Sequence, residues 1–202
     1  MSKACVVKID PENPDGSAIE SAARALKNGS LVIFPTETVY GIAANLSDEK
    51  AIDRLYRIKD RPKDKPLTVH ISSMAMIEKM GCILTKKASR LIKKFWPGPL
   101  TIILKSKSGP TVGFRMPANK IALELIRSAG IPIVAPSANL SGKAAPLSAE
   151  DAMLDLSEKV DIVLDGGRTS IGVESTVVDL TVTPPKVLRE GAISTGDIMK
   201  YA

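Results

Sequence analysis

The sequence holds few of the residues on which several classes of protein depend. Its 202 residues include two cysteines and one histidine, and aromatic residues make up only 3% of the chain. Two cysteines are too few for a disulfide scaffold or for a zinc site of their own. A single histidine, His70, excludes metal sites with several histidines and leaves any histidine-dependent triad to that residue. The scarcity of aromatic side chains argues against a base-stacking surface like those of RNA-binding sheets.

Long hydrophobic runs are also missing. The longest, at 31–34 and 100–104, have the length of a strand, whereas a membrane helix needs about 18 apolar residues. The N-terminal residues have no apolar stretch, so we expect no signal peptide, no membrane contact and a location in the reducing cytoplasm. The common glycine-rich phosphate-binding motifs and the motifs of serine hydrolases and zinc proteases are absent too. A phosphate ligand would therefore need a less common arrangement.

Positive charge, in contrast, is in excess. Lysine and arginine number 28 against 22 aspartate and glutamate residues, which gives a net charge of +6. This excess suits an anionic partner such as a nucleic acid or a nucleotide. A surface that keeps the protein soluble explains a charge of this size equally well.

Strand and helix patterns alternate along the chain, which indicates an α/β fold. Late hairpin-like spacings predict a sheet with mixed parallel and antiparallel pairing, flanked by helices, in one domain over residues 1–202. We expect Ser17 with Glu20 and Ser47 to cap helices, and Asn119 and Gly130 to bound another. The expected strands are 4–9, 31–35, 67–71, 100–105, 111–116, 131–135, 161–164, 173–182 and 186–189, and the expected helices are 17–28, 47–59, 74–80, 86–95 and 119–129, one starting at 148, and a short C-terminal one.

A polar segment, PTETVYG at 35–41, directly follows a buried strand. Open α/β sheets bind ligands at the carboxyl ends of their strands. Thr36, Thr38 and Tyr40 share parity and would offer a row of hydroxyl groups. A polar continuation of the strand is the simpler interpretation of this segment alone.

The segment KDRPKDKP at 59–66 places Lys59, Arg61, Lys63 and Lys65 within seven residues. Its prolines stiffen the chain, so less entropy is lost when the cations gather around a polyanion. A triphosphate needs several converging cations when no P-loop is present. A solvated charged loop remains the open alternative.

Two strands carry unusual polar residues. His70 lies opposite the apolar stripe of its strand, so it faces either solvent or the wall of a pocket. Arg115 lies in a half-buried strand, where it would fork onto a ligand carboxylate or form a structural ion pair.

Hydroxyl and amide groups recur in the last third. In APSANLSG at 135–142, Ser137, Asn139 and free backbone N–H groups would form an anion-holding nest, or simply serve turn chemistry. GVESTVVD with Ser175 and VLREG with Arg189 are weak signals when taken singly.

Taken together, these motifs resemble one family. PTETVYG, K-x-R-P-x-x-K-P-L-x-x-H, F-W-P-G-P-L-T, R-M-P, A-P-S-A-N-x-S-G, G-x-x-S-T-V-V-D and R-E-G occur in this order between residues 30 and 191. Their sequence is similar to that of the YrdC-like L-threonylcarbamoyladenylate synthases, in the short form without an additional C-terminal domain. The resemblance implies a twisted mixed sheet around a basic concave pocket.

The resemblance also implies a reaction. L-Threonine, bicarbonate and ATP give threonylcarbamoyl-AMP, pyrophosphate and water, and a separate tRNA threonylcarbamoyl transferase uses the adenylate to modify adenosine 37 of tRNAs. Mg²⁺ is expected to arrive with ATP rather than at a metal site of the protein. No covalent nucleophile is needed.

Roles for individual residues follow from the same resemblance. Lys59 and Arg61 fall at the catalytic positions. The threonine-binding positions are Thr38, His70, Arg115, Ala135 and Ser175. The ATP-binding positions are Arg61, Lys65, Thr111, Ser137, Asn139, Ala145 and Arg189.

Two alternatives remain open at this point. A non-catalytic module could bind double-stranded RNA or tRNA with its basic concave face, which the net charge permits and which needs no aromatic platform. Carbamoyl transfer to another acceptor, as in hydrogenase-maturation proteins that contain this domain, is the other, although those chains are much longer.

Overall fold

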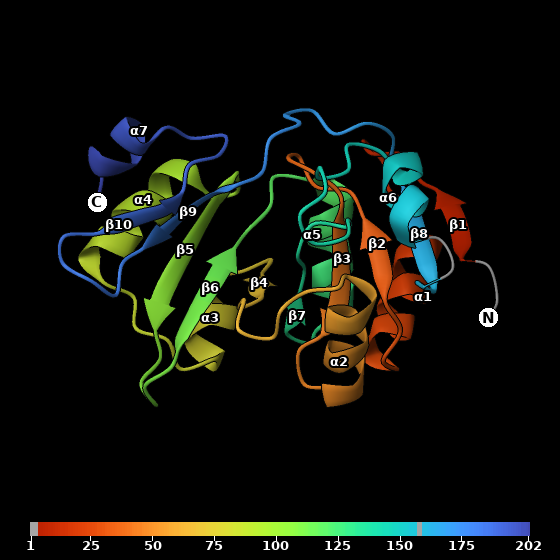
Figure 1. Cartoon of the computed structure of the whole chain (residues 1–202), viewed down its shortest axis with the longest axis horizontal. Helices are drawn as coiled ribbons and strands as arrows, with labels where there is room; N and C mark the ends of the chain where they lie inside the picture. Colours follow the sequence, from red (N-terminus) through yellow and green to blue (C-terminus); the bar gives the residue numbers. More distant parts are fainter. Residues whose placement is uncertain (1–3, 157–158) are drawn as a thin grey trace.

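The computed structural model describes residues 4–156 and 159–202. Within these residues the strands form one sheet in the order β1-β8-β2-β3-β7-β4-β6-β5-β9-β10, which crosses the molecule from right to left in Figure 1. Parallel pairs such as β4 with β6 alternate with antiparallel pairs such as β5 with β6, so the predicted mixed pairing is confirmed. The strands are β1 (Cys5–Lys8), β2 (Val32–Phe34), β3 (Gly41–Asn45), β4 (Thr68–His70), β5 (Leu100–Lys105), β6 (Thr111–Arg115), β7 (Ile133–Val134), β8 (Ile162–Asp165), β9 (Thr176–Asp179) and β10 (Lys186–Arg189).

Helices flank this sheet, as predicted. Figure 1 shows α3, α4 and α7 beside the strands of one half of the molecule and the other helices beside the second half. No helix in the described part of the chain is both long and apolar enough to cross a membrane. The helices are α1 (Gly16–Lys27), α2 (Glu49–Ile58), α3 (Ala75–Lys79), α4 (Lys86–Phe95), α5 (Lys120–Ala129), α6 (Ala149–Leu156) and α7 (Thr195–Met199).

Two hydrophobic cores lie on opposite sides of the sheet. One joins α1 and α5 to β2, β3, β7 and β8 through buried side chains such as Leu26, Phe34 and Leu125. The other joins α2, α3, α4, α6 and α7 to the opposite side, and it includes Val69, Ile102 and Phe114 from the strands β4, β5 and β6. Side chains alternate between the two faces of a strand. The other residues of β4, β5 and β6 therefore face the side of the sheet on which α1 and α5 lie. Among the described residues, none from these three strands belongs to the core around α1 and α5.

Local chemistry sets the helix ends. The Asn119 side chain accepts a hydrogen bond from Ala122 N, and Gly130 ends α5 with a left-handed φ of 63°, as predicted. The predicted capping box of Ser17 with Glu20 is wrong, because Asp15 caps α1 and accepts a hydrogen bond from Ser17 N at 2.9 Å. Ser47 is likewise displaced by its neighbour Asp48, which caps α2. In both places an aspartate within two residues of the predicted serine caps the helix, so the helix starts at a different residue.

The PTETVYG segment is a loop and not a continuation of the preceding strand, so that simpler interpretation was wrong. β2 ends at Phe34, and the chain re-enters the sheet at Gly41 as β3, a strand absent from the sequence-based prediction. β3 pairs antiparallel with β2, and its residues 41–44 are buried. A strand with both faces covered has no alternating pattern, and its two alanines give little strand signal.

Candidate functional site

A cavity lies on the face of β4, β5 and β6 that is opposite Val69 and Ile102. His70 of β4 and Arg115 of β6 are register partners in a parallel pair, so both side chains reach the same part of this face. Loops after β2, after β7 and before β9 complete the wall. The lining consists of Thr36, Val39, Gly41, Arg61, Pro66, Thr68, His70, Thr101, Arg115, Ala135, Pro136, Ser137, Glu174, Ser175 and Arg189.

Seven of the site residues expected from the sequence line this cavity. They come from six separate segments of the chain, and the fold brings them together. These residues are Arg61, His70, Arg115, Ala135, Ser137, Ser175 and Arg189.

Arg115 lies at one end of the cavity in a buried polar cluster. Its Nη2 is 2.8 Å from Glu37 Oε1 and donates a hydrogen bond of 2.8 Å to Thr38 Oγ1. Arg115 is 5% exposed and Glu37 6%, so this is a buried ion pair, and burial lowers the pKa of Arg115. The Nε of Arg115 makes no hydrogen bond to the described residues. The guanidinium is thus held in place by two partners and keeps donors for a third.

Glu37 is a site residue that the sequence reasoning missed. It lies in PTETVYG between Thr36 and Thr38, the two residues that were predicted to offer hydroxyl groups. The usable signal was Arg115 itself, because an arginine in a half-buried strand requires a carboxylate nearby. The predicted row of hydroxyls is correct for Thr36 and Thr38, which are 2.9 Å apart, but Tyr40 turns away and donates to Gly167 O.

His70 lies in the cavity wall and not toward solvent. It is 3% exposed, and its ring meets the edge of Phe34 with centroids 6.2 Å apart. Burial, followed by the nearby charge of Arg115, lowers the pKa of His70 from 6.5 to about 3. The ring is therefore neutral at physiological pH, and its Nδ1 has no hydrogen-bond partner among the described residues. His70 can exchange a hydrogen bond with a ligand but supplies no charge.

This low pKa predicts a pH dependence of stability. Between pH 6.5 and about 3, the unfolded chain binds a proton on His70 that the folded chain does not, so stability falls as the pH falls. Relative to His70→Gln, wild-type protein should lose about 1.4 kcal/mol of unfolding free energy per pH unit below 6.5. Urea unfolding of both proteins between pH 6.5 and 4.5 measures this. A difference between the two that does not change with pH would show that His70 titrates normally.

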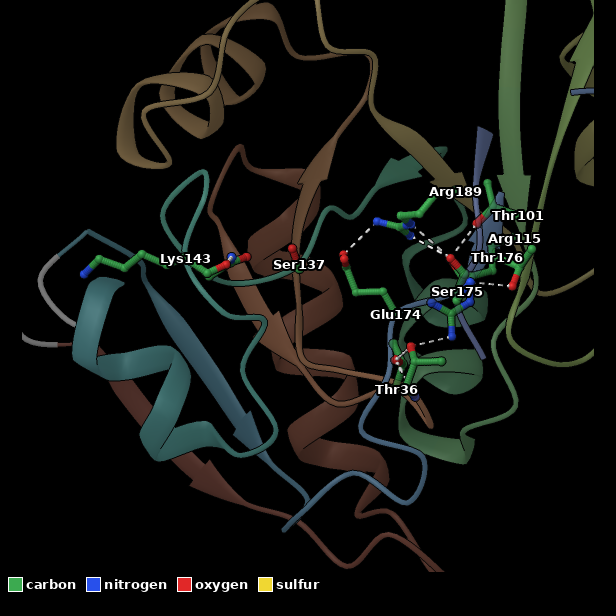
Figure 2. A network of polar contacts seen from close by, with 12 residues as sticks. Thr36, Thr101, Arg115, Ser137, Lys143, Glu174, Ser175, Thr176 and Arg189 are labelled. Atoms are coloured by element: carbon green, nitrogen blue, oxygen red, sulfur yellow. Dashed lines mark hydrogen bonds and ion pairs between the residues drawn. The ribbon is translucent and has the colours of Figure 1, made fainter. Parts of the chain in front are cut away.

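Arg189 lines the cavity beside Ser175. Figure 2 shows its contacts: Nη1 is 2.8 Å from Glu174 Oε1, and Nε and Nη2 donate to Ser175 O at 3.1 and 2.9 Å. The hydroxyls of Ser175 and Thr101 are 2.9 Å apart. Arg189 is 43% exposed at its side chain, so part of its charge still faces the cavity and solvent.

Lys59 lies beneath the cavity and does not line it. It is 2% exposed, and its Nζ donates to the backbone carbonyls of Ser137 and Asn139. Burial is the main cause that lowers the pKa of Lys59 from 10.5 to about 8, and the charge of Arg61 adds to it. Through these contacts Lys59 fixes the APSANLSG loop against the end of α2.

Part of the predicted nest of free amides is already used inside the protein, whereas the N–H groups of Ser137, Asn139 and Gly142 donate no hydrogen bond to the described residues. Ala138 N donates to Tyr40 O at 2.8 Å, Ser141 N donates to Lys59 O at 2.8 Å, and Leu140 N donates to Asp155. The Asn139 side-chain amide donates to Lys143 O at 2.7 Å. These groups hold the loop in shape, and the Ser137 residue faces the cavity.

The cations of KDRPKDKP separate into different environments. Arg61 lines the cavity, with Nη2 donating to Pro66 O at 2.9 Å. Lys63 pairs with Asp53 on the surface, and Lys65 is exposed outside the lining. Thr111 is exposed at the start of β6, and Ala145 is half-buried, so neither lines the cavity. The structure therefore brings one of the four cations, Arg61, to the cavity.

Comparison with known proteins gives consistent matches. The family model named for Sua5, YciO and YrdC, described as "Telomere recombination", matches residues 24–191. The threonylcarbamoyl-AMP synthase of Pyrococcus abyssi is 48% identical over 191 residues, which is 90% of this chain and 56% of that protein. This chain spans about half the length of the threonylcarbamoyl-AMP synthases of P. abyssi, Bacillus subtilis and Schizosaccharomyces pombe that it matches.

Two solved structures match the fold. A crystal structure of P. abyssi Sua5 complexed with L-threonine has a TM-score of 0.93 at 44% identity and covers 98% of this chain and 61% of that one. The crystal structure of E. coli YciO has a TM-score of 0.86 at 28% identity and covers 98% of this chain and all of that one.

Proposed function

Because this chain belongs to the Sua5/YciO/YrdC family, we propose that it makes threonylcarbamoyl-AMP and pyrophosphate from L-threonine, bicarbonate and ATP. The observation that carries the proposal is the anchored guanidinium of Arg115 in the cavity wall, next to the neutral His70. A fixed guanidinium with free donors is suited to the carboxylate of an amino acid. A relative of nearly the same fold has been crystallised with L-threonine.

The threonine end of the cavity is assigned to five residues. Arg115 binds the carboxylate, and Thr38 is the group that holds Arg115 from behind. His70 and Ser175 offer a neutral ring nitrogen and a hydroxyl, and the backbone around Ala135 forms the adjacent wall. Since His70 stays neutral, it does not compete with Arg115 for a negative charge.

The ATP end is assigned to the cationic side. Arg61 and Arg189 lie in the cavity lining, and Ser137 is presented by the loop that Lys59 holds. Lys65, Thr111 and Ala145 lie outside the lining and would contact ATP only at the mouth of the site. Asn139 and Lys59 act by shaping the loop, so we propose that both are positioning residues.

The chemistry joins the two ends. Bicarbonate takes up a proton and gives carbon dioxide and water, and the threonine amine adds to the carbon dioxide and releases a proton to form a carbamate. A carbamate oxygen then attacks the α-phosphorus of ATP, and the bond to the leaving pyrophosphate breaks. Two anions have to meet, and negative charge moves to the leaving group. The positive charges of Arg61 and Arg189 reduce the repulsion between the two anions and stabilise the negative charge on the leaving pyrophosphate. Holding the two substrates in fixed positions supplies much of the remaining rate gain.

The proposal extends to partners and location. Mg²⁺ would enter with the phosphates of ATP, since no group of three or more acidic, histidine or cysteine side chains in the described residues is arranged to hold a metal ion. The product would pass to a tRNA threonylcarbamoyl transferase in the cytoplasm. Direct binding of tRNA or double-stranded RNA stays a separate prediction, and the matches do not favour a non-catalytic RNA-binding module.

Pyrophosphate release by the purified protein tests the proposal. Release should require ATP, L-threonine and bicarbonate together, and mass spectrometry should detect a threonine-containing AMP adduct. Release from ATP alone would contradict the proposed reaction. No release, with no binding of ATP or L-threonine, would instead favour the RNA-binding alternative.

A further inference from the structure

Glu174 lines the cavity, but neither end of the proposed site uses it. Among the described lining residues it is the only carboxylate, in a wall that otherwise carries three guanidinium groups and the neutral ring of His70. Its side chain is 38% exposed, and its Oε1 lies 2.8 Å from Nη1 of Arg189, toward which it is turned in Figure 2. Its second oxygen, Oε2, accepts no hydrogen bond from the described residues. One oxygen of this carboxylate is therefore available to a ligand.

The backbone of Glu174 is fixed by the turn that follows β10. Its carbonyl oxygen accepts a hydrogen bond from Ala192 N at 3.0 Å. Gly191 packs so closely against this segment that an added Cβ would lie 2.2 Å from Glu174 O and 2.8 Å from Ser175 O. Arg189 also donates to Ser175 O at 2.9 Å. The sequence R-E-G at 189–191 thus fixes the point from which the Glu174 side chain reaches the cavity.

Glu174 stands between the two ends of the proposed site. Along the chain it is next to Ser175, which is assigned to L-threonine, and its side chain pairs with Arg189, which is assigned to ATP. Its negative charge also opposes the burial that lowers the pKa of Arg115, so it acts on the guanidinium at the threonine end. In the proposed reaction the carbamate forms where the two substrates meet. The threonine nitrogen therefore has to lie near this carboxylate.

A free amino acid presents two opposite charges to its site. The proposed function matches the carboxylate of L-threonine with Arg115, and the ammonium group is left without a partner of opposite charge. The ring of His70 and the hydroxyl groups of Thr101 and Ser175 are neutral, so their hydrogen bonds to a cation are weaker than those of a carboxylate. Glu174 is the group in the described lining that supplies the missing charge.

We propose that Glu174 binds the ammonium group of L-threonine and accepts the proton that the nitrogen releases as the carbamate forms. This inference rests on the proposed function. One ammonium proton goes to bicarbonate, which gives carbon dioxide and water. The nitrogen lone pair then forms the bond to the carbon of carbon dioxide, and one C=O electron pair moves to oxygen. An N–H proton of this adduct passes to the Glu174 carboxylate, which is exposed enough to return it to solvent.

Glu174→Gln tests the inference, because the amide keeps the size of the side chain and removes its charge. Isothermal titration calorimetry should give a Kd for L-threonine that is roughly ten- to a hundredfold higher than in wild type, the usual effect of losing a hydrogen bond to a charged group. The 2-hydroxy analogue of L-threonine, in which a hydroxyl group replaces the ammonium group, should bind both proteins alike. The Kd for ATP should stay the same or fall. The kcat for pyrophosphate release at saturating L-threonine should fall by roughly 10²–10⁴, the range for losing a general base.

Glu190→Gln is the matched control. It removes the same charge from the residue next to Arg189, but Glu190 does not line the cavity, and its Oε2 accepts a hydrogen bond from Thr195 N at 2.7 Å. The Kd values and kcat should therefore stay at the wild-type level.

The outcomes separate this inference from the proposed function. If Glu174→Gln binds L-threonine as tightly as wild type, or loses as much affinity for the 2-hydroxy analogue, Glu174 does not bind the ammonium group, and the proposed function stands. An unchanged kcat would show that another group takes the proton. If Glu174→Gln weakens ATP and L-threonine alike and melts at a lower temperature, the carboxylate is structural and the inference is wrong. If wild type itself binds no L-threonine, the proposed function fails and this inference fails with it.

Discussion

Replacing Arg115 with methionine is expected to lower the free energy of unfolding by about 3–5 kcal/mol, because it leaves the carboxylate of Glu37 buried without its partner. The carboxylate of Glu37 forms an ion pair with Arg115, and its two oxygens accept no hydrogen bond from the described residues. L-Threonine binding should be lost as well, since the guanidinium is the proposed carboxylate ligand. Urea unfolding and calorimetric titration with L-threonine measure the two effects.

A second variant separates stability from binding. In Arg115→Met with Glu37→Leu, no charge is left buried, and a buried ion pair replaced by apolar residues of similar size often leaves stability unchanged or higher. We expect the unfolding free energy to return to within about 1 kcal/mol of wild type. L-Threonine binding should stay absent. A stable double variant that binds L-threonine normally would refute the role assigned to Arg115.

Replacing Arg61 with alanine is expected to reduce kcat for pyrophosphate release by roughly 10²–10³, the usual cost of removing a group that stabilises developing charge. The fold should be unaffected, because the Arg61 side chain is only half-buried and donates to two carbonyls of its own loop. Steady-state kinetics with saturating L-threonine and bicarbonate measure the change.

Lys63→Ala is the matched control for Arg61→Ala. Lys63 lies two residues away in the same charged loop, but it pairs with Asp53 at the surface with its side chain 75% exposed. Activity should therefore stay at the wild-type level. Equal losses in the two variants would mean that the loop acts through its total charge and that Arg61 has no specific position in the site.

Much of the fold could be predicted from short-range patterns. α4 and β5 start and end where the sequence placed them, and the Asn119 cap with the Gly130 stop bounded α5 correctly. β3 could not be predicted, because its burial comes from partners on both faces and not from its own pattern. The predicted caps Ser17 and Ser47 were wrong because an aspartate that also caps helices, Asp15 or Asp48, lies within the same turn.

The site was harder to predict than the fold because its groups meet only in three dimensions. Motifs identified Arg115 and His70, but the pairing of β4 with β6 is what makes them neighbours. Lys59 looked like Arg61 in the sequence, yet the end of α2 directs it under the loop and away from the cavity. Glu37 was not identified from the sequence because its partner, Arg115, is 78 residues away along the chain.

The hydrogen bonds around Thr36 and Thr38, next to Arg115, fix which hydroxyl group donates and which accepts. Thr36 Oγ1 donates to Val39 O at 2.7 Å, so its single proton is committed. Thr38 must then donate to Thr36, and its lone pairs remain for Arg115. Folding therefore fixes the orientation of both hydroxyl groups. A ligand that binds to Arg115 does not have to pay the entropy of ordering them. A valine at position 38 would keep the shape of the side chain and break this one-way relay.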